Sequence, residues 1–369
     1  MPTDVDPAAA AGGILTIDLS ALVANWRLLA GRVAPAVCAA VVKADGYGLG
    51  LERVGAALHR AGARRFYVAL PEEGFRLRRT LPDAEIFVLN GLFPGLEQAL
   101  LDARLWPVLN DLGQVEQWSR FASSGRKPLP AVIQIDTGMN RLGLPEVELE
   151  TLLARPELLA PLQVLTVMSH MACADEPDHH LNQAQLAHFR RLAGRLAAPR
   201  TSLAASSAIF LGPDFHCGEV RPGIALYGGN PTPGRPNPMA QVIDLKARVL
   251  QVRELDRIPT VGYGATFSGV AGSRIATISL GYADGYLRSL SNSGCVFVGD
   301  VPVPVAGRVS MDLVTLDVSR LPPGQPRPGD LVTCIGAAQP VDAVASAAGT
   351  IGYEILTALG RRFHRVYLG

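Results

Sequence analysis

Residues 37–61 read VCAAVVKADGYGLGLERVGAALHRA and combine three patterns in one stretch. Residues 37–42 are a continuous apolar run, residues 43–50 contain three glycines, and residues 51–61 have apolar side chains at helical spacing. A continuous apolar run indicates a strand that is buried on both faces, which requires helices covering a parallel sheet. The stretch therefore predicts a strand, a glycine-rich turn and a helix in an α/β fold.

The same alternation continues to about residue 228. Seven further apolar runs follow the first, at 65–70, 85–89, 105–109, 131–135, 164–169, 202–205 and 224–227. Helical spacing is found at 21–33, 51–61, 71–79, 94–103, 112–121, 146–153 and 179–196. Eight runs over about 215 residues match a (β/α)8 barrel of the TIM type. A doubly wound open sheet would give a similar pattern, and the eighth run has no obvious helix after it.

A proline-rich segment, NPTPGRPNP at 230–238, ends this pattern. Proline supplies no amide donor and favours extended backbone before it, so the segment is typical of a connector. Beyond it, polar and apolar residues alternate at 246–253, 274–280, 294–299 and 331–336 between Gly, Pro and Asp turns, which favours antiparallel strands. We expect a flexible N-terminus at 1–12, a barrel at 13–238 and a mainly antiparallel β domain at 239–369.

The composition excludes several classes of protein. Lys and Arg number 34 against 33 Asp and Glu, so the net charge of +1 gives no electrostatic reason to bind nucleic acid or an anionic membrane. Five dispersed cysteines without a CxxC pair argue against a disulfide framework or a thiolate metal site, and no metal is expected. Acidic residues near the start and the lack of a long apolar window predict a soluble cytoplasmic enzyme.

Polar side chains follow three of the predicted strands. Lys43 follows the first run, Arg141 lies in DTGMNRLG after the fifth, and His170 ends the sixth. Barrel enzymes build their sites at the carboxyl ends of the strands, and apolar surroundings lower the pKa of a lysine as Schiff-base formation requires. Each residue also has a structural explanation: a solvated lysine, a turn capped by Asp136, and a hydrogen-bonded core histidine.

The last two runs add groups that suit a phosphate. Ser207 follows the seventh run, and Arg221 and Gly223 lie in EVRPGIALYG. Hydroxyls and glycine amides late in a barrel commonly bind phosphate, although a turn fixed by proline would give the same string. Because lysine, arginine, histidine and serine all follow strand ends, they predict one site on one face of the barrel.

Tyrosines beside glycines mark the C-terminal part. Tyr263 lies in VGYGATF, Tyr282 in SLGYADGYLR and Tyr353 in IGYE. Such side chains can act as acids, bases or hydrogen-bond donors, although aromatic residues near strands more often belong to a core. A tyrosine that acts as a base needs nearby cations, because its ordinary pKa is near 10.

Together these strings resemble the alanine racemases, which are pyridoxal-phosphate enzymes of fold type III. VVKADGYGLG, DTGMNRLG, SHMACADE, EVRPGIALYG, VGYGATF, SLGYADGYLR, GRVSMD and IGYE occur in the family's order and spacing, from about residue 14 to the end. The resemblance implies interconversion of L- and D-alanine, serving peptidoglycan synthesis or alanine catabolism. It also implies pyridoxal 5'-phosphate as cofactor and a cytoplasmic homodimer whose active sites are shared between subunits.

The resemblance assigns a role to each candidate residue. Lys43 and Tyr263 match the two catalytic bases, the tyrosine coming from the other subunit. The cofactor-binding positions are Lys43, Tyr47, His170, Ser207, Arg221, Gly223, Ile224 and Tyr353. The substrate-binding positions are Arg141 and Met311, and the entrance positions are Asp175, Tyr282, Arg288 and Arg308.

The sequence departs from the family at two positions. Gln134 stands where many relatives carry a carbamylated lysine that orients the arginine matched by Arg141, and a neutral amide lacks the negative charge of a carbamate. Ser206 stands where relatives often have asparagine, which bears on the choice of substrate. Three alternatives remain open here: a racemase for a larger amino acid, a non-catalytic cofactor-binding regulator, which would lack the β domain, and a decarboxylase, whose characteristic cysteine segment has no counterpart.

Overall fold

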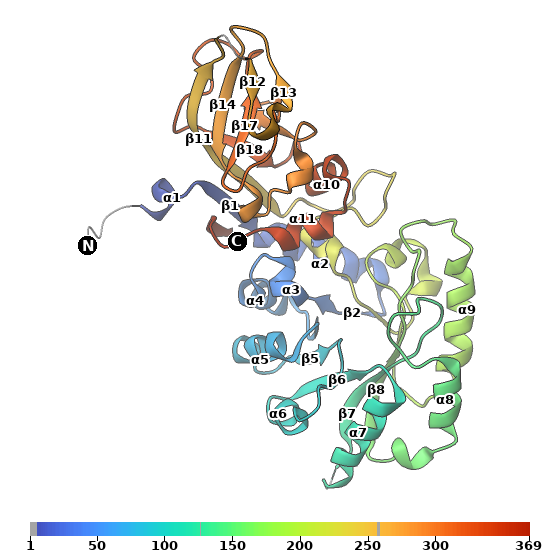
Figure 1. Cartoon of the computed structure of the whole chain (residues 1–369). Helices are drawn as coiled ribbons and strands as arrows, with labels where there is room; N and C mark the ends of the chain where they lie inside the picture. The colour runs from blue at the N-terminus through green and yellow to red at the C-terminus, as the bar shows by residue number, and fades with distance from the viewer. Residues whose placement is uncertain (1–5, 126, 257–258) are drawn as a thin grey trace. The chain divides into compact units, whose positions relative to one another are not determined.

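The computed structural model of the chain describes residues 6–125, 127–256 and 259–369. These residues form two compact units (Figure 1). The barrel unit comprises Val23–Leu226 and Asn230–Met239. The β unit comprises the described residues up to Leu22, Tyr227–Gly229 and Ala240–Gly369. Among the described residues, no helix has both the length and the apolar character needed to cross a membrane.

The barrel unit contains a closed parallel sheet. Its strands are β2 (Val37–Cys38), β3 (Ala40–Val41), β4 (Arg65–Val68), β5 (Glu85–Val88), β6 (Leu105–Leu109), β7 (Leu129–Gln134), β8 (Leu162–Met168), β9 (Thr201–Ser202) and β10 (Glu219–Val220). Their order is β2-β10-β9-β8-β7-β6-β5-β4-β3. Because only Ala39 separates β2 from β3, the two ends of this order are halves of one strand. The sheet thus closes on itself, which confirms the predicted (β/α)8 barrel.

Helices alternate with these strands along the outside of the barrel (Figure 1). They are α2 (Leu19–Val33), α4 (Leu51–Ala61), α5 (Pro71–Thr80), α6 (Glu97–Asp102), α7 (Leu112–Ser123), α8 (Glu146–Leu153) and α9 (Leu181–Ala193), with the short α3 (Lys43–Tyr47) after β3. All four residues of β4 are buried, as expected for a strand that packs on both faces. Phe66, Tyr67 and Phe87 are among the largest fully buried side chains.

The prediction of a strand at 224–227 is wrong. Ile224–Tyr227 form a 3-10 turn, and the last strand of the barrel is β10, five residues earlier along the chain. Pro222 lies between them and has no amide to donate to a sheet. The four residues of the turn are buried, and an apolar run of this length cannot distinguish a buried turn from a buried strand.

The β unit contains a mainly antiparallel eight-stranded sheet. Its strands are β1 (Gly13–Asp18), β11 (Ile243–Glu254), β14 (Arg274–Ser279), β15 (Cys295–Val298), β16 (Val301–Pro304), β17 (Leu313–Asp317), β18 (Leu331–Ile335) and β19 (His364–Leu368). A hairpin of β12 (Thr260–Val261) and β13 (Phe267–Ser268) and the helices α10 (Val341–Ala348) and α11 (Gly352–Ala358) complete it.

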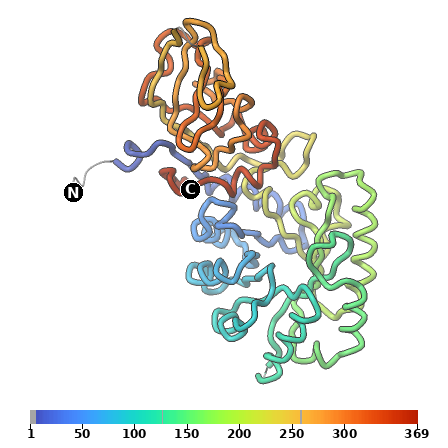
Figure 2. Tube along the Cα trace, in the orientation of Figure 1, coloured from blue at the N-terminus to red at the C-terminus, as the bar shows by residue number. Residues whose placement is uncertain are grey.

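The start of the chain differs from its expected place. We expected residues 13–22 in the barrel, but β1 pairs antiparallel with β11 and parallel with β19 and belongs to the β unit. In Figure 2 the blue beginning of the chain lies beside its red end for this reason. Of the N-terminus expected to be flexible, residues 1–5 lie outside the described residues. Pro7–Ala10 form the short helix α1, and the Arg248 guanidinium donates to the carbonyls of Ala8 (3.0 Å) and Ala11 (3.2 Å).

Candidate active site

Lys43 begins a turn of unusual backbone conformation. Only Val42 separates it from β3, so it lies at the carboxyl end of a barrel strand, where the sequence placed it. Ala44, Asp45 and Gly46 then have φ of 54°, 55° and 64°, and Tyr47 has φ of 54°. L-residues in this left-handed region are strained by about 1–2 kcal/mol each. The glycines predicted a turn, but nothing in the sequence indicated that Ala44 and Asp45 would be left-handed as well.

The Lys43 amine lies among positive charges. Burial lowers its pKa most, and the Arg141 and Arg221 guanidiniums lower it further, while Glu73 is the carboxylate that opposes them. A larger fraction of the amine is therefore neutral at a given pH than for a lysine in water. This is the condition that the sequence predicted for a nucleophilic lysine.

Arg221 is hydrogen-bonded to the carbonyl of Ser169, the residue directly before His170. The Arg221 side chain, only 4 % exposed, donates to the Ser169 carbonyl at 2.6 Å and to the Ser202 hydroxyl. His170 is the next residue after Ser169. Burial lowers the pKa of His170 to about 3, and the charges of Arg221, Arg141 and Lys43 add to this. The imidazole is therefore neutral near pH 7.

Tyr47 and Gly223 approach each other closely. A Cβ atom on Gly223 would lie 2.1 Å from the Tyr47 hydroxyl, so this position requires glycine. The Ser206 hydroxyl accepts hydrogen bonds from the amides of Gly223 (3.0 Å) and Ala225 (3.2 Å). Ser206, which we noted only as a departure from the family, thus fixes the segment that carries Gly223 and Ile224. Ser207 follows it and begins a 3-10 turn, Ser207–Phe210.

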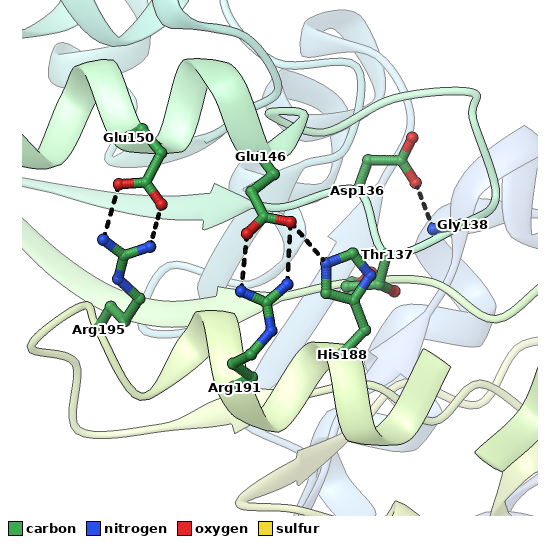
Figure 3. Close-up of polar contacts among 9 residues, drawn as sticks. Asp136, Thr137, Gly138, Glu146, Glu150, His188, Arg191 and Arg195 are labelled. Carbon is green, nitrogen blue, oxygen red and sulfur yellow. Dashed lines mark hydrogen bonds and ion pairs between the residues drawn. The ribbon is translucent and has the colours of Figure 1, made fainter. Parts of the chain in front are cut away.

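The loop that carries Arg141 is fastened at both ends. Asp136 Oδ1 accepts from the amide of Gly138 at 2.9 Å (Figure 3). It also accepts from the amide of Met139 at 3.1 Å, which is the turn-capping role considered for it. At the other end, Gln134 Nε2 donates to the Leu142 carbonyl at 3.0 Å. Gln134 therefore holds the main chain beside Arg141 by a neutral hydrogen bond, and the Arg141 side chain itself is exposed.

Sequence reasoning missed Gln185 on α9. This side chain is 1 % exposed; its Nε2 donates to the His170 carbonyl (3.0 Å) and its Oε1 accepts from the Ala172 amide (2.9 Å). It thereby fixes the segment around His170. Beside it, the hydroxyls of Thr137 and Ser169 are 2.7 Å apart and join two neighbouring strand ends. A lone glutamine on a helical face gives no signal of such a role.

Ion pairs on the outer surface connect side chains of α8 and α9. Glu146 accepts from Arg191 at 2.7 and 2.9 Å and contacts His188 at 3.3 Å, and Glu150 pairs with Arg195 (Figure 3). These side chains are solvent-exposed, so screening leaves them little influence on stability. None of them was a predicted site residue.

The remaining candidates lie in the β unit, except Asp175, which is exposed in the loop after His170. All six are exposed: Tyr263, Tyr282, Arg288, Arg308, Met311 and Tyr353. Tyr263 is 72 % exposed and begins a 3-10 turn, and the Arg308 guanidinium packs so closely on this turn that a Cβ on Gly264 would lie 2.8 Å from it. The Tyr282 amide donates to the Ser310 carbonyl at 3.0 Å and so joins the loops that carry Tyr282 and Met311.

The structure thus places Lys43, Arg141, His170 and Arg221 after strands of one barrel, where the charges of Arg141 and Arg221 lower the pKa of both Lys43 and His170, and it sets Tyr47 against Gly223. It places the predicted tyrosines of the C-terminal part on the surface of the β unit. Every barrel residue of this group follows a strand or lies in the loop after one, as the sequence predicted.

Both units match known protein families. The family model for the alanine racemase N-terminal domain matches residues 17–231, and that for the C-terminal domain matches residues 242–367. Alanine racemase from Rhodospirillum rubrum is 50% identical over 361 residues, covering 97% of this chain and 96% of that protein. A catabolic alanine racemase from Agrobacterium fabrum is 50% identical over 362 residues, covering 98% and 93%.

Solved structures agree with the sequence matches. Alanine racemase from Bartonella henselae, with covalently bound pyridoxal phosphate, superposes with a TM-score of 0.94 at 42% identity, covering 97% of this chain and 100% of that chain. The biosynthetic alanine racemase from Pseudomonas aeruginosa gives a TM-score of 0.91 at 37% identity, with the same coverage. Two family models that together span nearly all the described residues, and relatives at half identity over almost the whole chain, show that this protein belongs to the alanine racemase family.

Proposed function

We propose that this chain is a pyridoxal-phosphate-dependent racemase that interconverts L- and D-alanine, with Lys43 and Tyr263 as its two bases. The observation that carries the proposal is the position of Lys43. Its amine lies at a strand end of a closed barrel and has a pKa that is lowered by burial and by the charges of Arg141 and Arg221. The relatives named alanine racemase at 50% identity supply the substrate.

The residues of the barrel unit fit the cofactor. The charges that act on Lys43 are two guanidiniums and one carboxylate, so with its own ammonium form the site favours an anionic ligand. Tyr47, Ser207 and the Gly223–Ile224 segment are the groups for the phosphate, and Lys43 is the group for the covalent link that the Bartonella henselae enzyme has with its cofactor. When bound, the cofactor delocalises the negative charge left on the α-carbon of the amino acid.

The protonation state of each of these polar groups in the barrel suits a role in the proposed reaction. Lys43 can accept a proton because its pKa is lowered. Arg221 remains a donor, since a guanidinium keeps its proton at any ordinary pH, and it would face the ring nitrogen. The forked donors of Arg141 suit the carboxylate of an amino acid. His170, uncharged near pH 7, would pack on the ring without adding a charge.

Racemisation requires a proton to leave one face of the α-carbon and another to arrive on the opposite face. Lys43 would serve one face and Tyr263 the other. Tyr263 is exposed on a turn whose backbone is fixed by Gly264 and Arg308, which suits a group that projects towards a second copy of the chain. We propose a homodimer in which the tyrosine of each subunit completes the site of the other. Tyr353, Met311 and the entrance residues are also assigned to the site by this proposal.

Subunit mixing tests the shared site. Lys43→Ala and Tyr263→Phe are each expected to lose most activity as pure proteins. Mixed in equal amounts and allowed to exchange subunits, they should regain about a quarter of wild-type activity, because half of the dimers are mixed and each has one complete site. Mixing Lys43→Ala with a variant that carries both changes is the control and should regain nothing. No recovery in the first mixture would contradict a tyrosine supplied by the partner.

A visible spectrum and a chiral assay test the rest of the proposal. The protein should bind pyridoxal phosphate covalently, and Tyr263→Phe should retain this while Lys43→Ala loses it. Turnover of alanine should exceed that of serine and lysine; faster turnover of lysine would instead favour a racemase for larger amino acids. A D-alanine requirement after deletion of the gene would indicate a biosynthetic role, and loss of growth on alanine would indicate a catabolic one.

All five cysteines, which lie among the described residues, are free thiols, and this supports the proposed cytoplasmic location.

A further inference from the structure

The left-handed turn after Lys43 must be held in place by its surroundings. Three residues that are not glycine, Ala44, Asp45 and Tyr47, have positive φ there. Such backbone persists only where neighbouring contacts over-determine it, and it is concentrated at functional sites. The contacts that impose this turn are therefore candidates for groups that control the position of Lys43.

Glu73, on α5, makes one such contact from a largely buried side chain. The residue is 9 % exposed. Its Oε1 accepts from the Asp45 amide in the middle of the turn at 3.2 Å, and its Oε2 accepts from the amides of Ala69 (2.8 Å) and Leu70 (3.2 Å). The bond to Leu70 is the ordinary cap of a helix N-terminus. Capping explains only one oxygen, whereas the other reaches a separate element that carries Lys43.

A second contact from α5 holds the same residue by its side chain. Arg76, three residues after Glu73 and so on the same face of the helix, donates to Asp45 Oδ1 at 2.7 Å and to Glu52 at 2.9 Å. Asp45 Oδ1 also accepts from the Leu51 amide at 3.3 Å, where α4 begins. These side chains are 29–42 % exposed, so the Glu73 bond is the better shielded of the two connections.

We infer that Glu73 is a positioning residue: through the Asp45 amide it holds the left-handed turn that presents Lys43 for its covalent link to the cofactor. Arg76 supports it from the side-chain end of Asp45. The inference rests on the proposed function, because the link is to pyridoxal phosphate. Glu73 acts here on the main chain, and its effect reaches the lysine through two peptide units.

The test measures formation of the covalent link in cofactor-free protein after pyridoxal phosphate is added. The absorbance change gives the rate, and borohydride trapping with mass spectrometry locates the link on Lys43. Rates are compared at high pH, where they no longer change with pH, so that the amine is neutral in every variant. Glu73→Ala should be slower by at least about tenfold, since a misplaced reacting group commonly loses one to two orders of magnitude. Arg76→Gln should be slower by a smaller factor.

Glu148→Ala is the matched control. Its carboxylate accepts from the Leu112 amide at 2.8 Å, so it also joins a side chain to the start of a helix, but it lies away from the turn. It should form the link at the wild-type rate. Unfolding midpoints of all variants are measured in parallel, and the rates are taken well below them.

The outcomes separate the two proposals. If wild-type protein forms no link at Lys43, the proposed function fails. If wild type does so and Glu73→Ala forms the link as fast, the positioning role of Glu73 is overturned. Should Glu73→Ala not fold, Glu73→Gln decides, since it replaces one acceptor oxygen with a donor. The new NH2 group can face either the helix cap or the turn, so the rate of link formation in Arg76→Gln is measured as well. Wild-type rates in both Glu73→Gln and Arg76→Gln again overturn the inference.

Discussion

Arg65 Nε lies 2.8 Å from Glu219 Oε2, and both side chains are almost completely buried inside the barrel. The other carboxylate oxygen of Glu219 accepts from the Tyr67 hydroxyl at 2.5 Å. Glu219 is the first residue of β10 and stands two residues before Arg221, so the buried ion pair involves the strand that leads to a candidate site residue. Arg65 also pairs with Glu85, which is 44 % exposed, at 2.6 Å. Removing Glu219 therefore leaves Arg65 with this half-exposed partner alone and leaves the Tyr67 hydroxyl without its buried acceptor.

We therefore expect Glu219→Ala to lower the free energy of unfolding by about 3 kcal/mol, the lower end of the range for a broken buried pair, because Glu85 still compensates part of the Arg65 charge. Chemical denaturation of the cofactor-free protein measures the loss. Glu146→Ala is the comparison, because Glu146 is paired with Arg191 in solvent and should have little effect. Replacing both Arg65 and Glu219 by apolar residues should recover part of the loss. A Glu219→Ala protein as stable as Glu146→Ala would show that the buried pair does not support the barrel.

His170 makes the stability of the cofactor-free protein depend on pH. Its pKa in the folded chain is about 3, against an ordinary value of 6.5, so the unfolded chain binds more protons between these limits. Stability contributed by the neutral imidazole is therefore complete above pH 6.5 and is lost as the pH falls towards 3. Between pH 4 and 6, the slope of unfolding free energy against pH should be smaller in His170→Gln by about 1.4 kcal/mol per pH unit. Equal slopes would contradict a neutral His170 in the folded chain.

Arg141 should tune the pKa of Lys43. After burial, its guanidinium is the largest influence that lowers this pKa. Arg141→Gln should raise the pKa, so the pH at which covalent linkage to pyridoxal phosphate reaches half of its maximal rate should move upwards. The neutral amine is the reactive form, which gives the rate its rise with pH. Arg191→Gln, a surface change of the same type, should leave the midpoint unchanged. A midpoint that stays constant in Arg141→Gln would show that Arg141 does not lower the pKa of Lys43.

Much of the fold could be predicted because its patterns are local. The helices at 51–61 and 146–153 have the predicted bounds, since their apolar spacing has a clear start and end. The pairing of β1 with β19, at opposite ends of the chain, could not be predicted in this way. Strand partners depend on long-range packing that no window of sequence contains, so residues 13–18 were expected in the barrel.

The site shows the same division between local and distant causes. Lys43, Arg141 and His170 were found because each follows an apolar run, and the carboxyl ends of parallel strands meet at one face. Arg221 was found from its motif beside the run at 224–227, and the strand that it follows is β10. Glu73 was not found, because an acidic residue in the first turn of a helix is expected for capping alone. Its second bond, to Asp45, joins segments 28 residues apart and is visible only in the folded chain.

Gly223 provides the sharpest test of the phosphate-binding groups. A methyl group there would lie 2.1 Å from the Tyr47 hydroxyl, so Gly223→Ala must displace either the tyrosine or the segment held by Ser206. We expect weaker binding of pyridoxal phosphate by at least about tenfold in Kd, because the donors for the phosphate no longer converge. Gly31→Ala is the matched control: nothing lies within 4 Å of its added methyl group, and alanine favours the helix α2. That variant should bind the cofactor normally and unfold at a slightly higher denaturant concentration. Equal affinity for the cofactor in both variants would remove Gly223 and Tyr47 from the binding site.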